Sequence, residues 1–341
     1  MLEIRNEIER WRADGVETVV AALLVDMQGS GVRLPGALFA VAADGRIAGS
    51  VSGGCIEPGL IEEASALLDG QDHAEQSTTA RIKLVRYDQS GGRLLSRLAP
   101  CSESVDLALF YLDLEQYRQL GVLIDSGQEA LFTLVLDGEA AGRQRVTALE
   151  SLAGATAAAP SSEAARTTIV ETSAGREFRY RLSPPLQLVI VGGSHIAQHL
   201  ARLAGELGMA VSVVDPRPRF LTAARFADPV RRFQSHAPRA FEQLALDDRC
   251  AVCALSHDDK IDDAGLIAAL QRDAWYIGAL GSRATHAERC TRLADAGIED
   301  RALRRIHAPI GLSMAAVTPA EIALSILSQV VAEYRQHQPK R

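Results

Sequence analysis

The stretch Gln187-Leu-Val-Ile-Val-Gly-Gly-Ser-His195 places four apolar residues directly before two glycines. A short, continuous apolar run of this kind predicts a strand that is buried on both faces of a parallel sheet. Glycines that end such a strand and open a helix are typical of the turn that faces the pyrophosphate of a dinucleotide. The stretch therefore predicts a Rossmann-type α/β fold for the part of the chain that it opens.

The residues around this turn match most of the dinucleotide fingerprint Gly-x-Gly-x-x-Gly/Ala. Gly192 takes its first position and Ala197 its last, and Asp215 ends the next predicted strand, where an acid binds a ribose hydroxyl. Ser194 takes the middle position, where glycine normally lets the backbone approach the pyrophosphate. The fold prediction stands, whereas binding of NAD(P) becomes less well supported. The candidate nucleotide contacts are Gly192, Gly193, Ser194, His195 and Asp215.

Strands and helices alternate from residue 186 to about residue 335, which predicts a doubly wound parallel sheet. The six expected strands lie near residues 187–191, 210–215, 231–235, 250–255, 274–278 and 305–308. The last helix begins at a capping box, with Thr318 as N-cap, Pro319 at the first helical position and Glu321 three residues after the cap.

The first half of the chain predicts a separate mixed α/β domain over residues 1–139. Apolar runs flank Asp44-Gly45, a dipeptide that indicates a hairpin because both residues accept positive φ. A helix is expected over residues 57–68. Residues 140–185 are rich in Ala, Gly and Ser without sustained periodicity, and we expect a linker there that includes a short strand pair near 167–182.

Composition excludes several classes of protein. A net charge of -7 argues against nucleic-acid binding, which needs clustered basic residues. The charged N-terminus does not resemble a signal peptide, and no apolar stretch reaches the length that spans a bilayer. Five scattered cysteines form no disulfide framework. We expect a reduced, cytoplasmic protein that does not bind membranes.

The most distinctive motif of the first half is Gly49-Ser-Val-Ser-Gly-Gly-Cys-Ile-Glu57, between an expected strand and a helix. Amides of the Gly-Gly pair could surround an anion, and Cys55 near a helix N-terminus would have its thiolate favoured. The same motif also fits a structural turn with a buried cysteine, and the residues alone leave both interpretations open. The candidate contacts here are Ser50, Ser52, Gly53, Gly54, Cys55 and Glu57.

Three strings in the chain resemble the XdhC/CoxI family of maturation factors for xanthine and carbon monoxide dehydrogenases. They are Ser50-Val-Ser-Gly-Gly-Cys-Ile-Glu57, Tyr276-Ile-Gly-Ala-Leu-Gly-Ser-Arg-Ala-Thr-His286 and Arg305-Ile-His-Ala-Pro-Ile-Gly-Leu312. The resemblance implies a chaperone that binds the molybdenum cofactor, protects it, supports its sulfuration and delivers it to a xanthine dehydrogenase-type apoprotein. Cys55 would then be a soft ligand for molybdenum.

The chain departs from the family at a second cysteine motif. Where the family usually has Cys-Gly-Gly, this sequence has Cys101-Ser102-Glu103. Cys101 is kept as a candidate cofactor contact, but Glu103 would bring a negative charge toward an anionic ligand. Binding of the cofactor by this member is therefore in doubt.

Two further loops follow predicted strands of the C-terminal domain, where open α/β sheets bind ligands. His257 lies in Ser256-His-Asp-Asp259, and Arg283, which could hold a phosphate, follows Ser282, the expected cap of the next helix. N-capping and surface contacts are the alternative roles of such polar loop residues. Cys250 and Cys253 lie on a strand, where positions i and i+3 face opposite ways, so we expect core packing.

Three functions remain open at this point. The first is the non-enzymatic cofactor chaperone, with a molybdoenzyme apoprotein and a cofactor-sulfurating enzyme as partners. The second is an NAD(P)-dependent oxidoreductase built on the C-terminal domain. The third is an interaction factor that has kept the fold and lost its ligands. A homodimer is expected in each case, because twofold symmetry is the commonest among oligomers.

Overall fold

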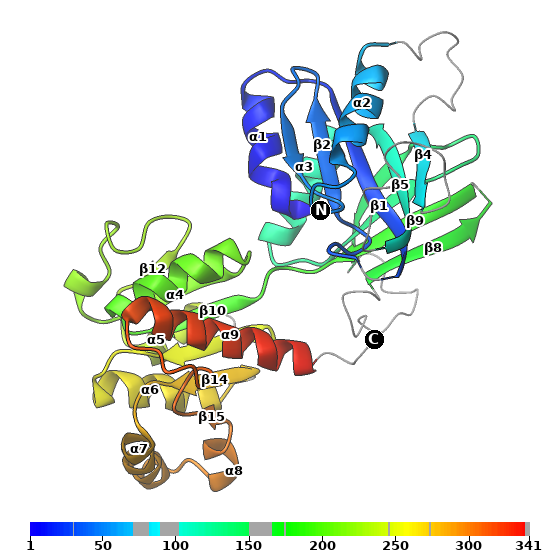
Figure 1. The fold of residues 1–341 in the computed structure, drawn as a ribbon. Helices are drawn as coiled ribbons and strands as arrows, with labels where there is room; N and C mark the ends of the chain where they lie inside the picture. The colour runs from blue at the N-terminus through cyan, green and yellow to red at the C-terminus, as the bar shows by residue number, and fades with distance from the viewer. Residues whose placement is uncertain are drawn as a thin grey trace. The chain divides into compact units, whose positions relative to one another are not determined.

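A computed structural model divides the chain into two compact units, one from Met1 to Pro184 and one from Pro185 onward (Figure 1). Unit 1 is mixed α/β and unit 2 contains a fully parallel sheet, which confirms the predicted fold class. The structure describes residues 1–29, 31–70, 82–88, 102–149, 166–173, 175–244, 246–272 and 274–337.

Unit 1 is built on a five-stranded antiparallel sheet in the order β3-β2-β1-β5-β4. Its strands are β1 (Val19–Gly29), β2 (Leu38–Ala42), β3 (Ile47–Gly49), β4 (Ile82–Asp88) and β5 (Ser102–Tyr111). The predicted hairpin at Asp44-Gly45 joins β2 to β3, with Val41 opposite Ile47. Gly45 has φ +86°, the left-handed conformation that the turn requires.

A second sheet, in the order β7-β6-β9-β8, completes unit 1. Its strands are β6 (Ala130–Val135), β7 (Gln144–Ala148), β8 (Thr167–Thr172) and β9 (Gly175–Leu182). The expected linker over residues 140–185 is therefore corrected, because β7, β8 and β9 all belong to this sheet. The short strand pair expected near 167–182 is present as β8 and β9, and it joins this sheet because β9 pairs with β6.

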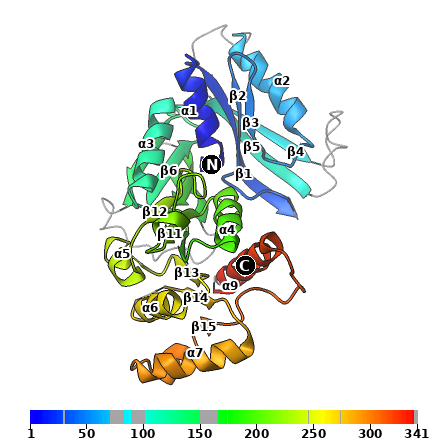
Figure 2. The same ribbon diagram turned by 90° about the vertical axis from the view of Figure 1, so that its left-hand side faces the viewer.

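The helices of unit 1 cover both faces of the first sheet, as Figure 2 shows. α2 (Glu57–Leu68) packs Leu60 and Leu67 against one face. The short turn η1 (Leu2–Ile4), α1 (Arg5–Ala13), α3 (Leu114–Asp125) and the second sheet pack against the other. Because both faces of β1 are covered, its first seven residues are all apolar.

Unit 2 contains a six-stranded parallel sheet in the order β12-β11-β10-β13-β14-β15. Its strands are β10 (Gln187–Val191), β11 (Ala210–Val214), β12 (Arg231–Phe233), β13 (Cys250–Ala254), β14 (Tyr276–Ala279) and β15 (Ile306–His307). This is the strand order of the dinucleotide-binding fold. Successive strands are added on one side of β10 up to β12, and on its other side from β13 onward. Ligands of such sheets bind beyond the carboxyl ends of the strands at this change of side, between β10 and β13.

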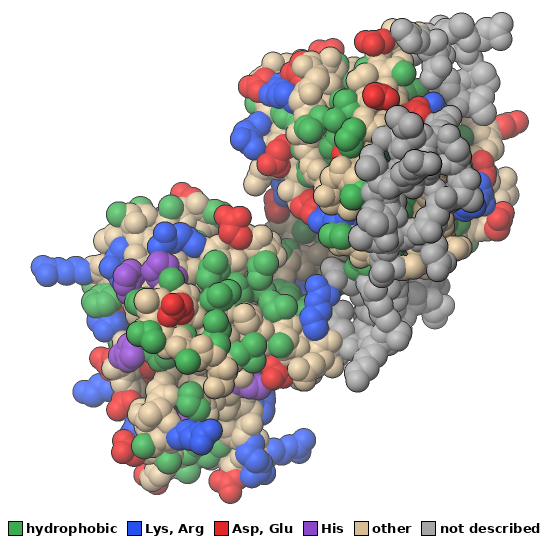
Figure 3. All heavy atoms as spheres, viewed as in Figure 1, with side chains coloured by type: hydrophobic (Ala, Val, Ile, Leu, Met, Phe, Trp, Pro, Cys, Tyr) green, Lys and Arg blue, Asp and Glu red, His purple; other side chains and the backbone are tan. Residues whose placement is uncertain are grey.

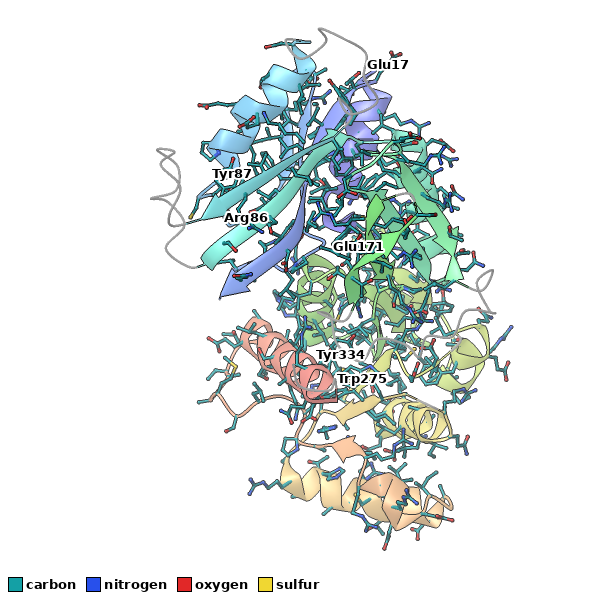
Figure 4. All side chains as sticks on the ribbon, turned by 90° about the vertical axis from the view of Figure 1, so that its right-hand side faces the viewer. Glu17, Arg86, Tyr87, Glu171, Trp275 and Tyr334 are labelled. Atoms are coloured by element: carbon teal, nitrogen blue, oxygen red, sulfur yellow. The ribbon has the colours of Figure 1, made fainter. Side chains whose placement is uncertain are left out.

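Helices cover both faces of this sheet. α4 (His195–Glu206) and α9 (Pro319–His337) pack on one face, and α5 (Ala237–Gln243), α6 (Asp259–Leu270), α7 (Arg283–Asp295) and α8 (Asp300–Leu303) lie on the other side. α9 starts at the predicted capping box, since the Glu321 carboxylate accepts from the Thr318 amide at 2.9 Å. Figure 4 shows Tyr334 of α9 beside Trp275, with ring centroids 5.6 Å apart.

Hydrophobic side chains gather on the surface of unit 2 over α9 (Figure 3). Among the exposed ones are Leu324 of α9 and Leu312 and Met314 of the loop before it. A groove between α4 and α9, about 430 Å³ in volume, is lined by Leu203 and Leu324, and no predicted site residue lines it. In the described residues no helix is long and apolar enough to cross a bilayer.

Candidate functional site

The Gly-Cys turn of unit 1 runs from the end of β3 to the start of α2. Gly53 has φ +86° and Gly54 has φ +111°, so both positions favour glycine. A side chain added at Gly54 would meet no atom within 4 Å, whereas one at Gly53 would lie 3.7 Å from Val32. Open space therefore lies beside the glycine that precedes Cys55.

The carboxylate of Glu57, the first residue of α2, sits at the centre of this turn. Glu57 is only 7% exposed. Its two oxygens accept hydrogen bonds from Ser50 Oγ, Val51 N, Ser52 N, Ser52 Oγ and Gly54 N. Burial alone would raise the pKa of Glu57, but the serine hydroxyls and the backbone amide of Ser52 lower it to about 2. A carboxylate that is ionised at neutral pH thus organises the turn.

The serine hydroxyls satisfy the remaining amides of the turn. Ser50 Oγ accepts from the Gly53 amide at 2.9 Å. Ser52 Oγ accepts from the amides of Cys55 at 3.1 Å and Ile56 at 3.2 Å, as a helix N-cap does. The amides that the sequence suggested for an anion are consequently occupied by groups of the turn itself.

Cys55 is the reactive group that this arrangement leaves available. Its thiol is partly exposed, forms no disulfide and adjoins the core beneath α2. A thiolate is a suitable soft ligand for molybdenum, and the preceding residue, Gly54, has no non-neighbouring atom within 4 Å of an added Cβ. The thiol therefore fits a molybdenum-containing ligand, whereas the amides do not fit an anion without rearrangement of Glu57.

The second cysteine motif cannot be compared with this turn. Cys101 lies outside the described residues, and of Ser102 and Glu103 only the backbone is described, as the start of β5. Among the described residues, no three His, Cys, Asp or Glu side chains form a cluster that could hold a metal ion. A metal bound by Cys55 would therefore be part of a larger bound molecule, and not an ion held by a cluster of protein side chains.

In unit 2, the fingerprint glycines are required by close packing. Gly192 has φ +100°, and a Cβ there would lie 2.4 Å from Ser256 Cα. A Cβ on Gly193 would lie 2.5 Å from the carbonyl oxygen of Phe220. Ser194 is the N-cap of α4, and its Oγ accepts from the Ala197 amide at 3.2 Å. His195 is exposed on the first turn of α4.

The structure places Asp215, the predicted ribose contact, in a buried position. This side chain has 0% exposure, so it cannot reach a ligand in this conformation. Its carboxylate accepts from the Gly193 amide at 2.8 Å and from the Arg217 amide, Nε and Nη2 at 2.8–2.9 Å. Burial alone would raise the pKa of Asp215, but these hydrogen bonds lower it. The Asp215 carboxylate therefore stabilises the turn through hydrogen bonds and does not face solvent.

Two arginines around this turn were missed by sequence reasoning. The Arg217 guanidinium stacks 4.0 Å from the ring centroid of Phe220, and Arg225 lies 5.5 Å from the same ring. Arg225 Nη2 also donates to the Gly193 carbonyl at 2.8 Å. The sequence did contain a signal for this arrangement. Arginines follow the acid closely in Asp215-Pro-Arg-Pro-Arg, and they could have indicated that the Asp215 carboxylate pairs with an arginine.

The other predicted loop residues lie at the same carboxyl edge of the sheet. His257 is exposed, with the unusual φ of +59°, and follows Ser256, which contacts Gly192. Arg283 is exposed at the start of α7, after Ser282, whose predicted N-cap role is confirmed. The structure thus brings residues 192–194, 256–257 and 283 to neighbouring turns.

The remaining cysteines pack as the sequence indicated. Cys250 and Cys253 are fully buried in β13. Burial raises the pKa of the Cys250 thiol to about 12 and also raises that of Cys253. Cys290 is partly buried on α7, with its Sγ 3.5 Å from His286 Nε2. The core role predicted for Cys250 and Cys253 is confirmed.

Comparison with known proteins gives two family matches and several relatives. The family model described as "XdhC and CoxI family" matches residues 11–88, and "XdhC Rossmann domain" matches residues 188–330. The chain is 29% identical to the molybdenum cofactor insertion chaperone PaoD of Escherichia coli K12 over 319 residues, 94% of this chain and 84% of PaoD. It is 26% identical to a probable xanthine dehydrogenase subunit of Bacillus subtilis 168 over 327 residues, 92% of this chain and 93% of that protein.

A solved structure shares the fold of the whole chain. It is described as a xanthine dehydrogenase from Bacillus halodurans, has a TM-score of 0.74 and is 23% identical, and the match covers 97% of this chain and 96% of that one. The two family models match different units, and both relatives match along more than nine-tenths of this chain. The chain belongs to the XdhC and CoxI family.

Proposed function

We propose that this protein is a chaperone that binds the molybdenum cofactor as cargo, protects it and helps to insert it into a xanthine dehydrogenase-type apoprotein. The observation that carries the proposal is the partly exposed Cys55, which has no disulfide, on a turn that Glu57 holds in place. Similarity to PaoD along 94% of the chain supports the same class of function.

The residues of the turn would have two different roles, binding of the cargo and positioning of the thiol. Cys55 would supply a thiolate to the molybdenum of the cargo, which is a soft metal centre. Glu57 and the serines would keep the backbone in the conformation that presents this thiol, rather than contact the cargo themselves. The cargo supplies the redox chemistry of the client enzyme, while this chain supplies binding and delivery.

We expect Cys55→Ser to lower the amount of copurified pterin and molybdenum at least about tenfold, a loss of about 1.4 kcal/mol in affinity. The reason is that a hydroxyl is a much poorer ligand than a thiolate for a soft metal. Pterin would be measured by fluorescence after oxidation and molybdenum by mass spectrometry, in protein from a molybdenum-replete host. Cys290→Ser, which changes a partly buried cysteine of unit 2, is the matched control. Wild-type protein without pterin would contradict the proposal.

The buried position of Asp215 argues against the oxidoreductase hypothesis. A site for NAD in this fold uses an acid that reaches the ribose hydroxyl, and here that acid is buried and bonded to Arg217. We therefore expect NADH to bind the full-length chain with a Kd above about 1 mM in calorimetric titration. Saturable binding well below that concentration would reinstate NAD(P) as a ligand of unit 2.

The proposed function implies partners. They are the molybdoenzyme apoprotein and an enzyme that sulfurates the cofactor, which would meet this chain in the cytoplasm, and we propose that the chaperone acts as a homodimer. Pull-down of a molybdoenzyme polypeptide by pterin-free protein would instead favour an interaction factor without a ligand.

A further inference from the structure

The turn that joins β14 to α7 is a second place in unit 2 where a ligand could bind. It comprises Leu280, Gly281, Ser282 and Arg283, at the carboxyl edge of the sheet and next to the turn that follows β13. Gly281 has φ +136°, and a Cβ there would lie 3.2 Å from Thr285 Cγ2. α7 is 13 residues long, and the first amides of any helix lack intrahelical partners.

Arg289 lies beneath this turn and is the main evidence that a ligand binds there. It is the largest fully buried side chain of the described residues, with 2% exposure. Its Nη2 donates to the Leu280 carbonyl at 3.0 Å. Its Nε and Nη1 have no hydrogen-bond partner within the described residues, and Nη1 lies 3.8 Å from the position of a Cβ on Gly281. Buried donors of a charged group are costly to leave unpaired, and a bound anion is one way to satisfy them.

The carboxylates near Arg289 are already engaged. Asp263 lies 3.6 Å from Arg289 Nε, but its two oxygens accept from Arg292 Nε and Nη2 at 2.7 and 3.2 Å. Asp262 accepts from the amide and hydroxyl of Ser256. Burial raises the pKa of Asp262, which favours its neutral form. Neither acid provides a hydrogen bond to Arg289 Nη1.

The outer side of the turn presents polar groups to solvent. Ser282 is exposed and its Oγ accepts from the Thr285 amide at 3.1 Å, which leaves the amides of residues 283 and 284 as the free start of the helix. Arg283 is exposed, and its side chain makes no hydrogen bond or ion pair with any described residue. Its guanidinium is therefore available for a ligand.

We propose that this turn binds a phosphate monoester. The first amides of α7 and the Arg283 guanidinium would contact the phosphate oxygens, and Arg289 would supply a fixed positive charge from beneath the turn. Helix N-termini favour anions, and a buried charge acts more strongly there than one in water. The phosphate is that of the pterin of the proposed cargo or that of a nucleotide, and the site does not depend on Cys55.

The test is calorimetric titration of the full-length chain with inorganic phosphate. We expect saturable binding that weakens at least about tenfold in Arg289→Met and in Arg283→Gln, the tenfold change corresponding to about 1.4 kcal/mol. Arg301→Gln, which changes an exposed arginine on α8, should bind phosphate as the wild type does. Circular dichroism would verify the fold, and because Arg283 is on the surface its variant tests the site even if Arg289→Met does not fold.

Two further titrations identify the source of the phosphate. A 6-alkylpterin phosphate that binds more tightly than inorganic phosphate and than its own dephosphorylated form would indicate the cargo. Tighter binding of AMP would indicate a nucleotide. Wild-type protein that binds none of these probes would overturn the proposal, as would unchanged phosphate affinity in folded Arg283→Gln. Because phosphate binding is measured without molybdenum, its failure is distinct from the failure of the Cys55 experiment.

Discussion

Replacing Glu57 with alanine is expected to lower the free energy of unfolding by about 3 kcal/mol or more, since each buried donor left unpaired costs about 1–3 kcal/mol. The carboxylate accepts from hydroxyls and amides of Ser50, Val51, Ser52 and Gly54, and Glu57 itself is only 7% exposed. Urea unfolding monitored by circular dichroism would measure the change. Glu62→Gln, an exposed position on the same helix, is the control and should change stability by less than about 0.5 kcal/mol.

The pH dependence of stability provides a second readout of the same residue. The pKa of Glu57 is about 2 in the folded protein against 4.5 ordinarily, so its ionised form stabilises the fold. That contribution is complete above pH 4.5 and is lost as the pH falls from 4.5 through about 2. Glu57→Gln should therefore flatten the decline of stability in this window. An equally steep decline in Glu57→Gln would show that other carboxylates cause it.

Gly192→Ala is expected to destabilise unit 2 by about 2–5 kcal/mol, the sum of a left-handed backbone penalty and a packing clash. The φ of Gly192 is +100°, and the added Cβ would lie 2.4 Å from Ser256 Cα and 2.5 Å from Ser256 N. Backbone atoms cannot move aside as a flexible side chain can, so the turn between β10 and α4 would have to shift. Thermal unfolding would report the loss.

A matched control is available on the helix that this turn opens. Gly205 lies in α4, and a Cβ there would meet nothing within 4 Å. Gly205→Ala should therefore stabilise the protein by about 0.5–1 kcal/mol, because alanine loses less conformational entropy in a helix. Two glycine-to-alanine changes in one unit would then have opposite signs. A destabilisation of similar size in both variants would contradict the role given to Gly192.

These predictions also bear on function. If Glu57→Gln keeps the fold but loses pterin, then the carboxylate positions Cys55, as proposed. If Cys55→Ser alone loses pterin while Glu57→Gln retains it, then the thiol binds cargo without help from the arrangement of the turn. Comparison of the two variants thus separates the ligand from the residue that positions it.

Features that depend on a few neighbouring residues could be predicted from the sequence. The apolar run of β10, the Asp44-Gly45 hairpin and the capping box at Thr318 all act within one turn or one strand, so local pattern determines them. The strand pair expected near residues 167–182 is present as β8 and β9, whereas β7, inside the expected linker, was not predicted. β9 pairs with β6, which lies far earlier in the sequence, and β8 pairs with β9.

The candidate sites depended more on tertiary structure. Sequence pattern identified Glu57 and Asp215 as ligand contacts, but both carboxylates turn inward, toward the Gly53-Gly54 turn and toward Arg217 respectively. Arg289 had no signal, because an arginine in an amphipathic helix usually faces water. Its burial follows from the packing of α7 against α6.

The sequence by itself thus determined that Gln187–His195 opens a parallel sheet, since burial on both faces requires an apolar strand and the turn requires glycine. Only the tertiary structure decided what the polar residues near that turn do. Hydrogen-bond partners are chosen by distance and direction between segments, which spacing along the chain does not specify. Asp215 therefore pairs with Arg217 and the Gly193 amide, whereas the buried donors without a hydrogen-bond partner lie at Arg289.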